Sequence, residues 1–278
     1  MKRCGGKSKR RFGRTAEARK WNMRRASGSH QVLTNVIGMT TFFQRACFPR
    51  PPPAKWLHVA GGFTLGVWAL LAWHSRATNG AALAGMLGAT GAAWLALALA
   101  WRMAPSGASR TIGWWAVAFR VAAFFSAPVM EDDHHRFLWD GHRFAATGNP
   151  YAEAPQASFG DDTVPAEFRA VLDRINHPDV PTVYGPLTEW AFRLSHAIAP
   201  ARLWPWKLIL IGAEAIVLAL LWPVLGARGR LLLAWCPLAI FETGFNAHPD
   251  ALAIALVVAA WWLGQKSRPL AEIGRAHV

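Results

Sequence analysis

Three carboxylates, two imidazoles and a guanidinium occupy six consecutive positions near the middle of the chain, Glu131-Asp132-Asp133-His134-His135-Arg136. The segment directly follows an apolar run, so its acids are expected at the mouth of a helix bundle, partly removed from water. Partial desolvation raises the pKa of a carboxylate, which suits it to take a proton from a hydroxyl nucleophile. A solvated cap on a helix end is the simpler interpretation, and composition alone favours it.

Further His, Asp and Tyr residues follow in short turns that are rich in Gly, Asn and Pro, residues typical of tight turns. The second cluster is Trp139-Asp140-Gly141-His142-Arg143, followed by Gly148-Asn149-Pro150-Tyr151. The third is Ile175-Asn176-His177-Pro178-Asp179, followed by Pro181-Thr182-Val183-Tyr184-Gly185-Pro186. The last polar turn, Asn246-Ala247-His248-Pro249-Asp250, separates two apolar runs.

The elements that must position these clusters are apolar runs. A helix needs about 20 residues to cross the roughly 30 Å of hydrocarbon in a bilayer. Four runs are of that order, residues 56–74, 80–101, 111–130 and 206–225. Two shorter runs, 231–245 and 251–264, could span with tilt or form a re-entrant hairpin. We therefore predict an all-α integral membrane protein with about six transmembrane helices and a large extracytoplasmic loop carrying short helices.

The formal net charge of +14 is concentrated at the N-terminus. Residues 1–55 hold 14 Lys or Arg and one acid, whereas residues 56–278 hold 16 bases and 15 acids. The body offers no basic face for a nucleic acid, and the basic end is expected in the cytoplasm. The predicted division is a basic disordered cytoplasmic extension (1–55), a multispanning membrane domain (56–264) with its extracytoplasmic loop (131–205), and a cytoplasmic tail (265–278).

Two features of the apolar sequence have two interpretations each. Arg120 and Glu214 stand inside the third and fourth runs, where a charge is costly, and either pair with each other or leave Arg120 to contact a phosphate. A stripe at helical spacing in the outer loop predicts a helix that lies flat at the membrane interface and guides a lipid, or one that packs against other helices. The stripe consists of Leu187, Trp190, Ala191, Leu194 and Ile198.

Taken in order, the polar clusters resemble a known family. The pattern runs from Asp132-Asp133-x-x-Arg136-Phe137-x-Trp139-Asp140-Gly141 through Gly148-Asn149-Pro150-Tyr151-x-x-Ala154-Pro155, Ile175-Asn176-His177-Pro178-Asp179-x-Pro181-Thr182-x-Tyr184 and Ala234-Trp235-x-Pro237-Leu238 to Asn246-x-His248-x-Asp250. It is similar to the polyprenyl-phosphate-sugar-dependent glycosyltransferases of the multispanning GT-C superfamily, and to bacterial mannosyltransferase-like members most of all. The likeness covers roughly residues 111–264.

The resemblance implies inverting transfer of a sugar, with mannose favoured, from a polyprenyl-phosphate donor to an acceptor hydroxyl on the extracytoplasmic face. Asp132 and Asp133 match the acidic pair of the family, and either is the expected base. Arg136 and His177 are the implied partners of the donor phosphate, because a guanidinium forks onto phosphate oxygens and a protonated imidazole assists the leaving group. The remaining residues that match motif positions and are expected to bind substrate are Asp140, Tyr184, Asn246, His248 and Asp250.

The implied partners are a polyprenyl-phosphate-sugar donor, a glycan or lipid-linked acceptor, and membrane lipid, with no nucleic acid. Carboxylates and imidazoles could hold a divalent metal, but no spacing demands one, so no cofactor is firmly predicted. The expected location is the bacterial inner (plasma) membrane, with several crossings and a cytoplasmic N-terminus.

Members of this family continue through several more membrane helices, so we expect the chain to be the N-terminal part of a longer enzyme, truncated at its C-terminus. The alternatives are an inactive fragment or a non-catalytic membrane protein that binds polyprenyl lipids. A transporter that uses Arg120 and Glu214 as pathway charges is less favoured, because the sequence shows no paired internal repeats.

Overall fold

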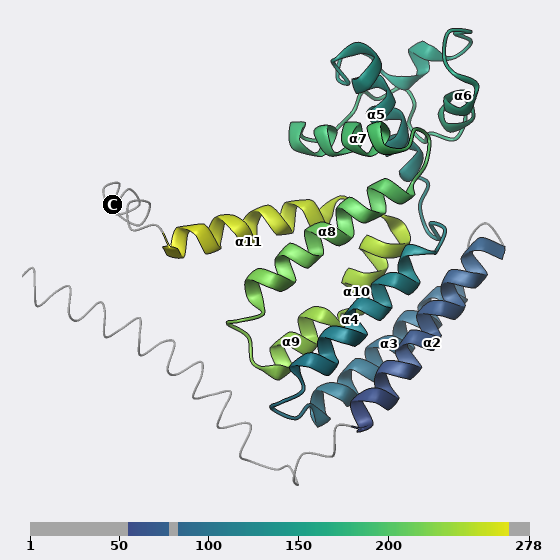
Figure 1. Cartoon of the computed structure of the whole chain (residues 1–278). Helices are drawn as coiled ribbons and strands as arrows, with labels where there is room; N and C mark the ends of the chain where they lie inside the picture. Colours follow the sequence, from purple (N-terminus) through teal and green to yellow (C-terminus); the bar gives the residue numbers. More distant parts are fainter. Residues whose placement is uncertain (1–54, 78–82, 267–278) are drawn as a thin grey trace, which may run out of the picture. The chain divides into compact units, whose positions relative to one another are not determined.

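The computed structural model describes residues 55–77 and 83–266 (Figure 1). Within these residues the chain is helical and contains no strand, which confirms the predicted all-α class. The helices are α2 (Lys55–Ala77), α3 (Leu83–Met103), α4 (Ser109–Phe124), α5 (His134–Thr147), η1 (Pro155–Ser158), α6 (Ala166–Leu172), α7 (Pro186–Ile198), α8 (Trp204–Leu221), α9 (Ala227–Ala234), α10 (Pro237–Ile240), η2 (Phe241–Asn246) and α11 (Asp250–Lys266).

Three of these helices are long enough and apolar enough to cross a membrane. They are α2, the Ala84–Met103 part of α3, and α8, with mean hydropathies of 1.3, 1.4 and 1.7. Much of their apolar surface is uncovered, as Trp73 on α2 and Leu87 on α3 illustrate with 67% and 63% exposure. A surface of this kind is stable against lipid, so the described chain has the character of a membrane protein.

The other predicted runs are shorter or broken in the structure. The run 111–130 is helical only as far as Phe124, and an irregular segment with Pro128 leads from there to α5. The run 231–245 is divided among α9, α10 and the π-helical turn η2, because Pro237 cannot continue the hydrogen-bonding pattern of α9. The apolar helix α11 is also short, with 17 residues. The short helices predicted between residues 131 and 205 are present as α5, η1, α6 and α7.

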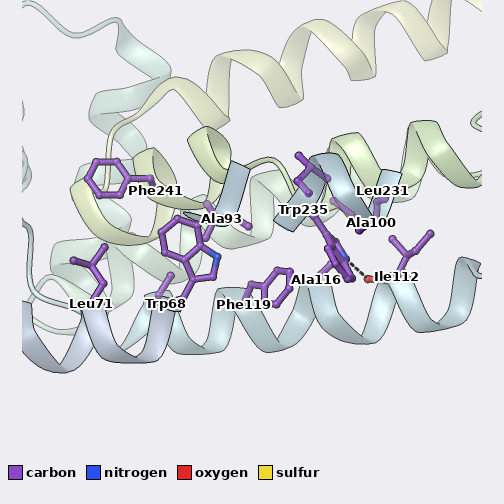
Figure 2. Close-up of a cluster of buried hydrophobic side chains, with 14 of the residues drawn as sticks. Trp68, Leu71, Ala93, Ala100, Ile112, Ala116, Phe119, Leu231, Trp235 and Phe241 are labelled. Atoms are coloured by element: carbon purple, nitrogen blue, oxygen red, sulfur yellow. Dashed lines mark hydrogen bonds between the residues drawn. The ribbon is translucent and has the colours of Figure 1, made fainter. Parts of the chain in front are cut away.

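Buried aromatic side chains join the apolar helices. Trp68 of α2 and Phe119 of α4 are fully buried, and Trp235, just after α9, packs edge-on against Phe119 at 5.1 Å between ring centroids. The indole nitrogen of Trp235 donates to the Ile112 carbonyl at 3.0 Å (Figure 2). This bond satisfies a buried donor and fixes the end of α9 against α4.

The short helices α5 and α7 pack together and onto α8. Phe137 of α5 stacks on Phe192 of α7, and both contact Trp206 near the start of α8. Gly141 allows the close approach of α5 to α7, because a Cβ at this position would lie 2.6 Å from the Phe192 carbonyl oxygen. The polar clusters on α5 are therefore held by α7 and α8.

The predictions for the basic extension (1–55) and the tail (265–278) concern residues that, apart from 55 and 265–266, lie outside the described ranges.

Candidate functional site

Three of the polar segments recognised in the sequence meet in the structure. Asn176 donates from its amide to Oδ1 of Asp132 and, at 3.4 Å, to Oδ1 of Asp133. Glu131 contacts His248 with 2.8 Å between Oε2 and Nε2. The segments 131–136, 175–179 and 246–250 thus form one cluster around Asp133, which we call the acidic cluster (Glu131, Asp132, Asp133, Asn176, His248).

His248 lies between two carboxylates. Its Nε2 faces Glu131, and its Nδ1 lies 2.7 Å from Oε2 of Glu242. The hydrogen bond to Glu242 is the main cause that raises the pKa of His248 to about 9, and the charge of Glu131 acts in the same direction against the opposing effect of burial. The imidazole is therefore protonated at neutral pH and donates from both nitrogens.

The local backbone explains how His248 reaches this position. Glu242 and Asn246 belong to the π-helical turn η2, which ends at Ala247 in the left-handed conformation with φ 61°. Trp206 donates from its indole nitrogen to the Ala247 carbonyl at 2.7 Å, and the His248 amide donates to the Glu242 carbonyl. A π-turn followed by a left-handed non-glycine residue is a costly arrangement of the kind found at functional sites.

The two aspartates differ in environment. Asp132 is exposed and bonded to Asn176, whereas Asp133 is partly buried. Burial is the largest cause that raises the pKa of Asp133, followed by the charge of Glu131. Asp133 stands at the N-cap of α5 but makes no capping hydrogen bond with its side chain, and the bond that its Oδ1 accepts from Asn176 is long, at 3.4 Å, so the carboxylate can still accept a hydrogen bond from a ligand.

The acidic cluster also contains a set of potential metal ligands. One ligand atom each from Glu131, Asp133 and His248 lies within 4.8 Å of the others. A carboxylate behind a ligating imidazole is the usual arrangement for orienting a metal-bound histidine, and Glu242 has that position here. A divalent cation would have to displace the proton between His248 and Glu131, because only a neutral imidazole ligates.

A second polar group lies on the inner side of α5. Arg136 contacts both carboxylate oxygens of Asp140, at 2.9 and 3.1 Å from Nε, and donates to the Val180 carbonyl. Thr182 donates to Glu189 at 2.7 Å. The guanidinium that was expected to bind the donor phosphate is thus engaged with a buried carboxylate, an i,i+4 pair on one helix face.

Glu189 is completely buried, and its Oε2 has no hydrogen-bond partner in the described structure. Burial first, and the charge of Asp140 second, raise the pKa of Glu189 to about 7. Its carboxyl group is accordingly partly protonated at neutral pH. It has no exposed surface through which to contact a substrate, so it belongs to the support of the site.

The remaining predicted residues have different surroundings. His177 is exposed and has a positive φ of 50°, and its electrostatic effect lowers the pKa of Asp133. Tyr184 packs edge-on against Phe137, and burial raises its pKa. Asn246 is buried and donates to Glu242 at 3.2 Å. Asp250 is exposed in the first turn of α11, and its charge is not among those that act on Asp133.

Sequence reasoning did not assign a role to Glu242, Glu189 or Asn176. A signal existed for Glu242, because it is a lone acid within the apolar run 231–245. Such an acid is expensive unless it is paired, and the structure pairs it with His248. Glu189 is not part of the apolar stripe of its helix, and its burial depends on α7 turning this polar face toward α5.

The apolar stripe of α7 is uncovered in the described structure. Leu187, Trp190, Leu194 and Ile198 are each more than half exposed, while Phe192 on the opposite face is buried. Arg193 lies over the ring of Trp190 at 4.9 Å. Of the two interpretations of this stripe, the exposure agrees with a helix that lies in a membrane interface.

Comparison of the chain with protein-family models, curated proteins and solved structures found no match.

Proposed function

We propose that the chain transfers a sugar, with mannose as the favoured one, from a polyprenyl-phosphate donor to an acceptor hydroxyl, with Asp133 as the base. The observation that carries this proposal is the meeting of three motif segments at one partly buried carboxylate. These segments are separated by many residues in the chain and still contact one another. Glu131 contacts His248, and Asn176 contacts Asp133.

The chemistry requires a carboxylate that accepts a proton while a leaving group departs. The Asp133 carboxylate takes the acceptor hydroxyl proton as the acceptor oxygen forms a bond to the anomeric carbon. The bond from that carbon to the phosphate oxygen breaks on the opposite face, so configuration inverts and polyprenyl phosphate leaves with the bonding electrons. A carboxylate with a raised pKa is a stronger base than an ordinary one, which supports Asp133 over the exposed Asp132.

We also propose that six segments cross or enter the membrane, with the N-terminus in the cytoplasm and the acidic cluster outside. The distribution of basic residues supports this orientation. The three long apolar helices would supply three of the crossings. The shorter helices α4 and α11 would cross where the bilayer adapts locally to their length. The broken segment α9–α10–η2 would enter the membrane where neighbouring helices surround it. The proposed location is the bacterial inner membrane.

The decisive experiment compares Asp133→Asn with Asp132→Asn in membranes that carry the full chain. Radiolabelled polyprenyl-phosphate-mannose is the donor, and transfer to endogenous acceptors is measured. Removal of a general base lowers rates by about 10²–10⁴-fold, so Asp133→Asn should abolish most transfer. Asp132→Asn keeps an amide beside Asn176 and should have a clearly smaller effect.

The matched control is Asp162→Asn, because Asp162 is an acid whose side chain is 99% accessible and which is not part of the acidic cluster. All variants must be present in the membrane in equal amounts. Absence of transfer by the inserted unmodified chain would contradict the proposed activity with this donor. Equal losses in Asp132→Asn and Asp133→Asn would contradict Asp133 as the base.

A further inference from the structure

A cavity of about 870 Å³ lies beside the N-terminal half of α5, outside the acidic cluster. Its walls come from the end of α2, the segment that follows α4, the α5 and α6 region, and the beginning of α8. The ends of apolar helices are where the headgroup layer of a membrane begins. This cavity, which we call the cationic cavity, is therefore at a depth where lipid headgroups are found.

The cationic cavity is lined by three arginines, which are permanently charged, and by one lysine. Arg76 comes from the end of α2, Arg174 follows α6, and Arg202 and Lys207 flank the start of α8. Among the described residues, no Asp or Glu lines the cavity and no carboxylate forms an ion pair with any of the four. Unbalanced charges of one sign in a concave site focus the field and favour an anion.

The inner wall of the cavity has polar atoms without a partner of opposite charge. Lys207 is only 1% exposed, and its Nζ donates to the Ser126 carbonyl at 2.7 Å and to the Ser126 hydroxyl at 3.0 Å. When it is protonated beside an anion, Nζ has a third donor, which remains for the ligand. Nδ1 of His134 and of His135, which also line the cavity, is buried without a hydrogen-bond partner in the described structure.

An apolar groove continues from the cavity along the membrane-facing helices. The groove has a volume of about 520 Å³, lies between α4 and α8, and shares Phe124 and Phe125 with the cationic cavity. Apart from Arg120, its lining is apolar. The helices α4 and α8 contact each other in the fold. A hydrocarbon chain leaving the cationic cavity past the two phenylalanines would enter this groove.

We infer that the cationic cavity and the groove bind a membrane lipid with a phosphate headgroup, with the phosphate between the arginines and Lys207 and a hydrocarbon chain between α4 and α8. Guanidinium groups bind phosphate oxygens through pairs of hydrogen bonds, and a buried ammonium adds a point charge. This site is distinct from Arg136 and His177, where sequence reasoning placed the phosphate. Lipid binding at this site is inferred from the cavity and its charges and does not depend on sugar transfer.

Binding is tested with radiolabelled hexadecyl phosphate and the purified full chain in neutral-detergent micelles. The double change Arg174→Ala with Arg202→Ala removes two exposed cations from the cavity and should weaken binding by about tenfold or more, since each loses a charge-assisted hydrogen bond. Arg169→Ala is the matched control, because Arg169 is an exposed arginine of α6 that does not line the cavity. It should bind as the unmodified chain does.

The groove is tested by a change that fills it. Ala215→Trp places a large ring in the lining, whereas Ile216→Trp places the same ring at the next, exposed position of α8 outside the lining. Only the first should weaken binding of hexadecyl phosphate, by about tenfold or more. Size-exclusion chromatography establishes that the variants are folded.

Three results would overturn the inference. The first is binding of hexadecanol as tight as that of hexadecyl phosphate, and the second is unchanged binding by the double arginine variant. The third is displacement of the lipid by inorganic phosphate as effectively as by unlabelled hexadecyl phosphate, which would indicate a site for a free anion. Because no sugar donor is present, a chain without transferase activity can still pass this test.

Discussion

A single protonated imidazole, that of His248, connects the acids before α5 with the broken helix near the end of the described chain. Glu131 contacts one nitrogen and Glu242 the other, and both contacts are short. The side chain of His248 is 17% exposed, so water weakens these interactions only in part. The geometry of the acidic cluster therefore depends on the protonation of one residue.

This arrangement predicts a loss of stability at alkaline pH. The pKa of His248 is raised from 6.5 to about 9, so its contribution is fully present below pH 6.5 and is lost as the pH rises through about 9. We expect the free energy of unfolding to fall by roughly 2 kcal/mol over this range. The measurement is thermal unfolding of the detergent-purified chain between about pH 6 and pH 10.

His248→Gln is the reference for this titration, because Gln donates a hydrogen bond but does not titrate. Other groups that change charge at high pH affect both proteins, so the difference between the two curves isolates His248. That difference should shrink as the pH rises. A difference that stays constant from pH 6 to pH 10 would show that the proton on His248 does not hold the cluster.

Close packing between two short helices sets the position of α5, and with it the position of Asp133 at its start. Gly141 is buried on α5 directly against the backbone of α7. A backbone carbonyl cannot rotate away as a side chain does, so the helices must separate if a Cβ is added at Gly141. The same packing turns Glu189 and Phe192 of α7 inward and leaves the apolar stripe of α7 outside.

We therefore expect Gly141→Ala to lower the free energy of unfolding by about 1–3 kcal/mol. Gly212→Ala is the matched control on α8, because nothing lies within 4 Å of a Cβ there. The control should be neutral or stabilising by up to about 1 kcal/mol, as alanine favours a helix over glycine. Thermal unfolding in detergent measures both changes, and similar effects of the two would contradict the close approach of α5 and α7.

Across the whole described chain, one buried ion pair joins helices that are far apart in sequence. Arg120 of α4 donates to Glu214 of α8 at 3.0 Å and to the Ala234 carbonyl at the end of α9 at 2.9 Å. Of the two interpretations of Arg120, the structure agrees with the ion pair to Glu214. Arg120 lines the groove between α4 and α8, and its bond to Ala234 satisfies a helix-end carbonyl.

Removing one charge of the pair should lower the free energy of unfolding more than removing both charges. Arg120→Leu or Glu214→Leu alone leaves one buried charge without a partner and should destabilise the protein by about 3–5 kcal/mol. The double variant removes both charges and should recover most of that loss, apart from the unpaired Ala234 carbonyl. Unfolding of the four proteins in one detergent measures this coupling, and additive single losses would contradict a direct interaction.

The sequence alone was sufficient for the helical class, for the three long apolar helices and for the short helices between residues 131 and 205. These features depend on local composition, because an apolar run of sufficient length favours a helix wherever its neighbours lie. The positions at which the apolar runs are interrupted were harder to predict. The division of the run 231–245 follows from Pro237, whose effect an average over an apolar run does not register.

The site shows the same division between local and long-range information. Residues 131–136, 175–179 and 246–250 could be recognised one by one, since each is a short polar segment beside apolar sequence. Only the tertiary structure decided that Glu131 meets His248 across 117 positions of the chain, that Arg136 is engaged with Asp140, and that three arginines and a lysine line one cavity. Those pairings arise when helices pack, because packing brings distant side chains together and burial then determines which of them must be neutralised, paired or left to bind a ligand.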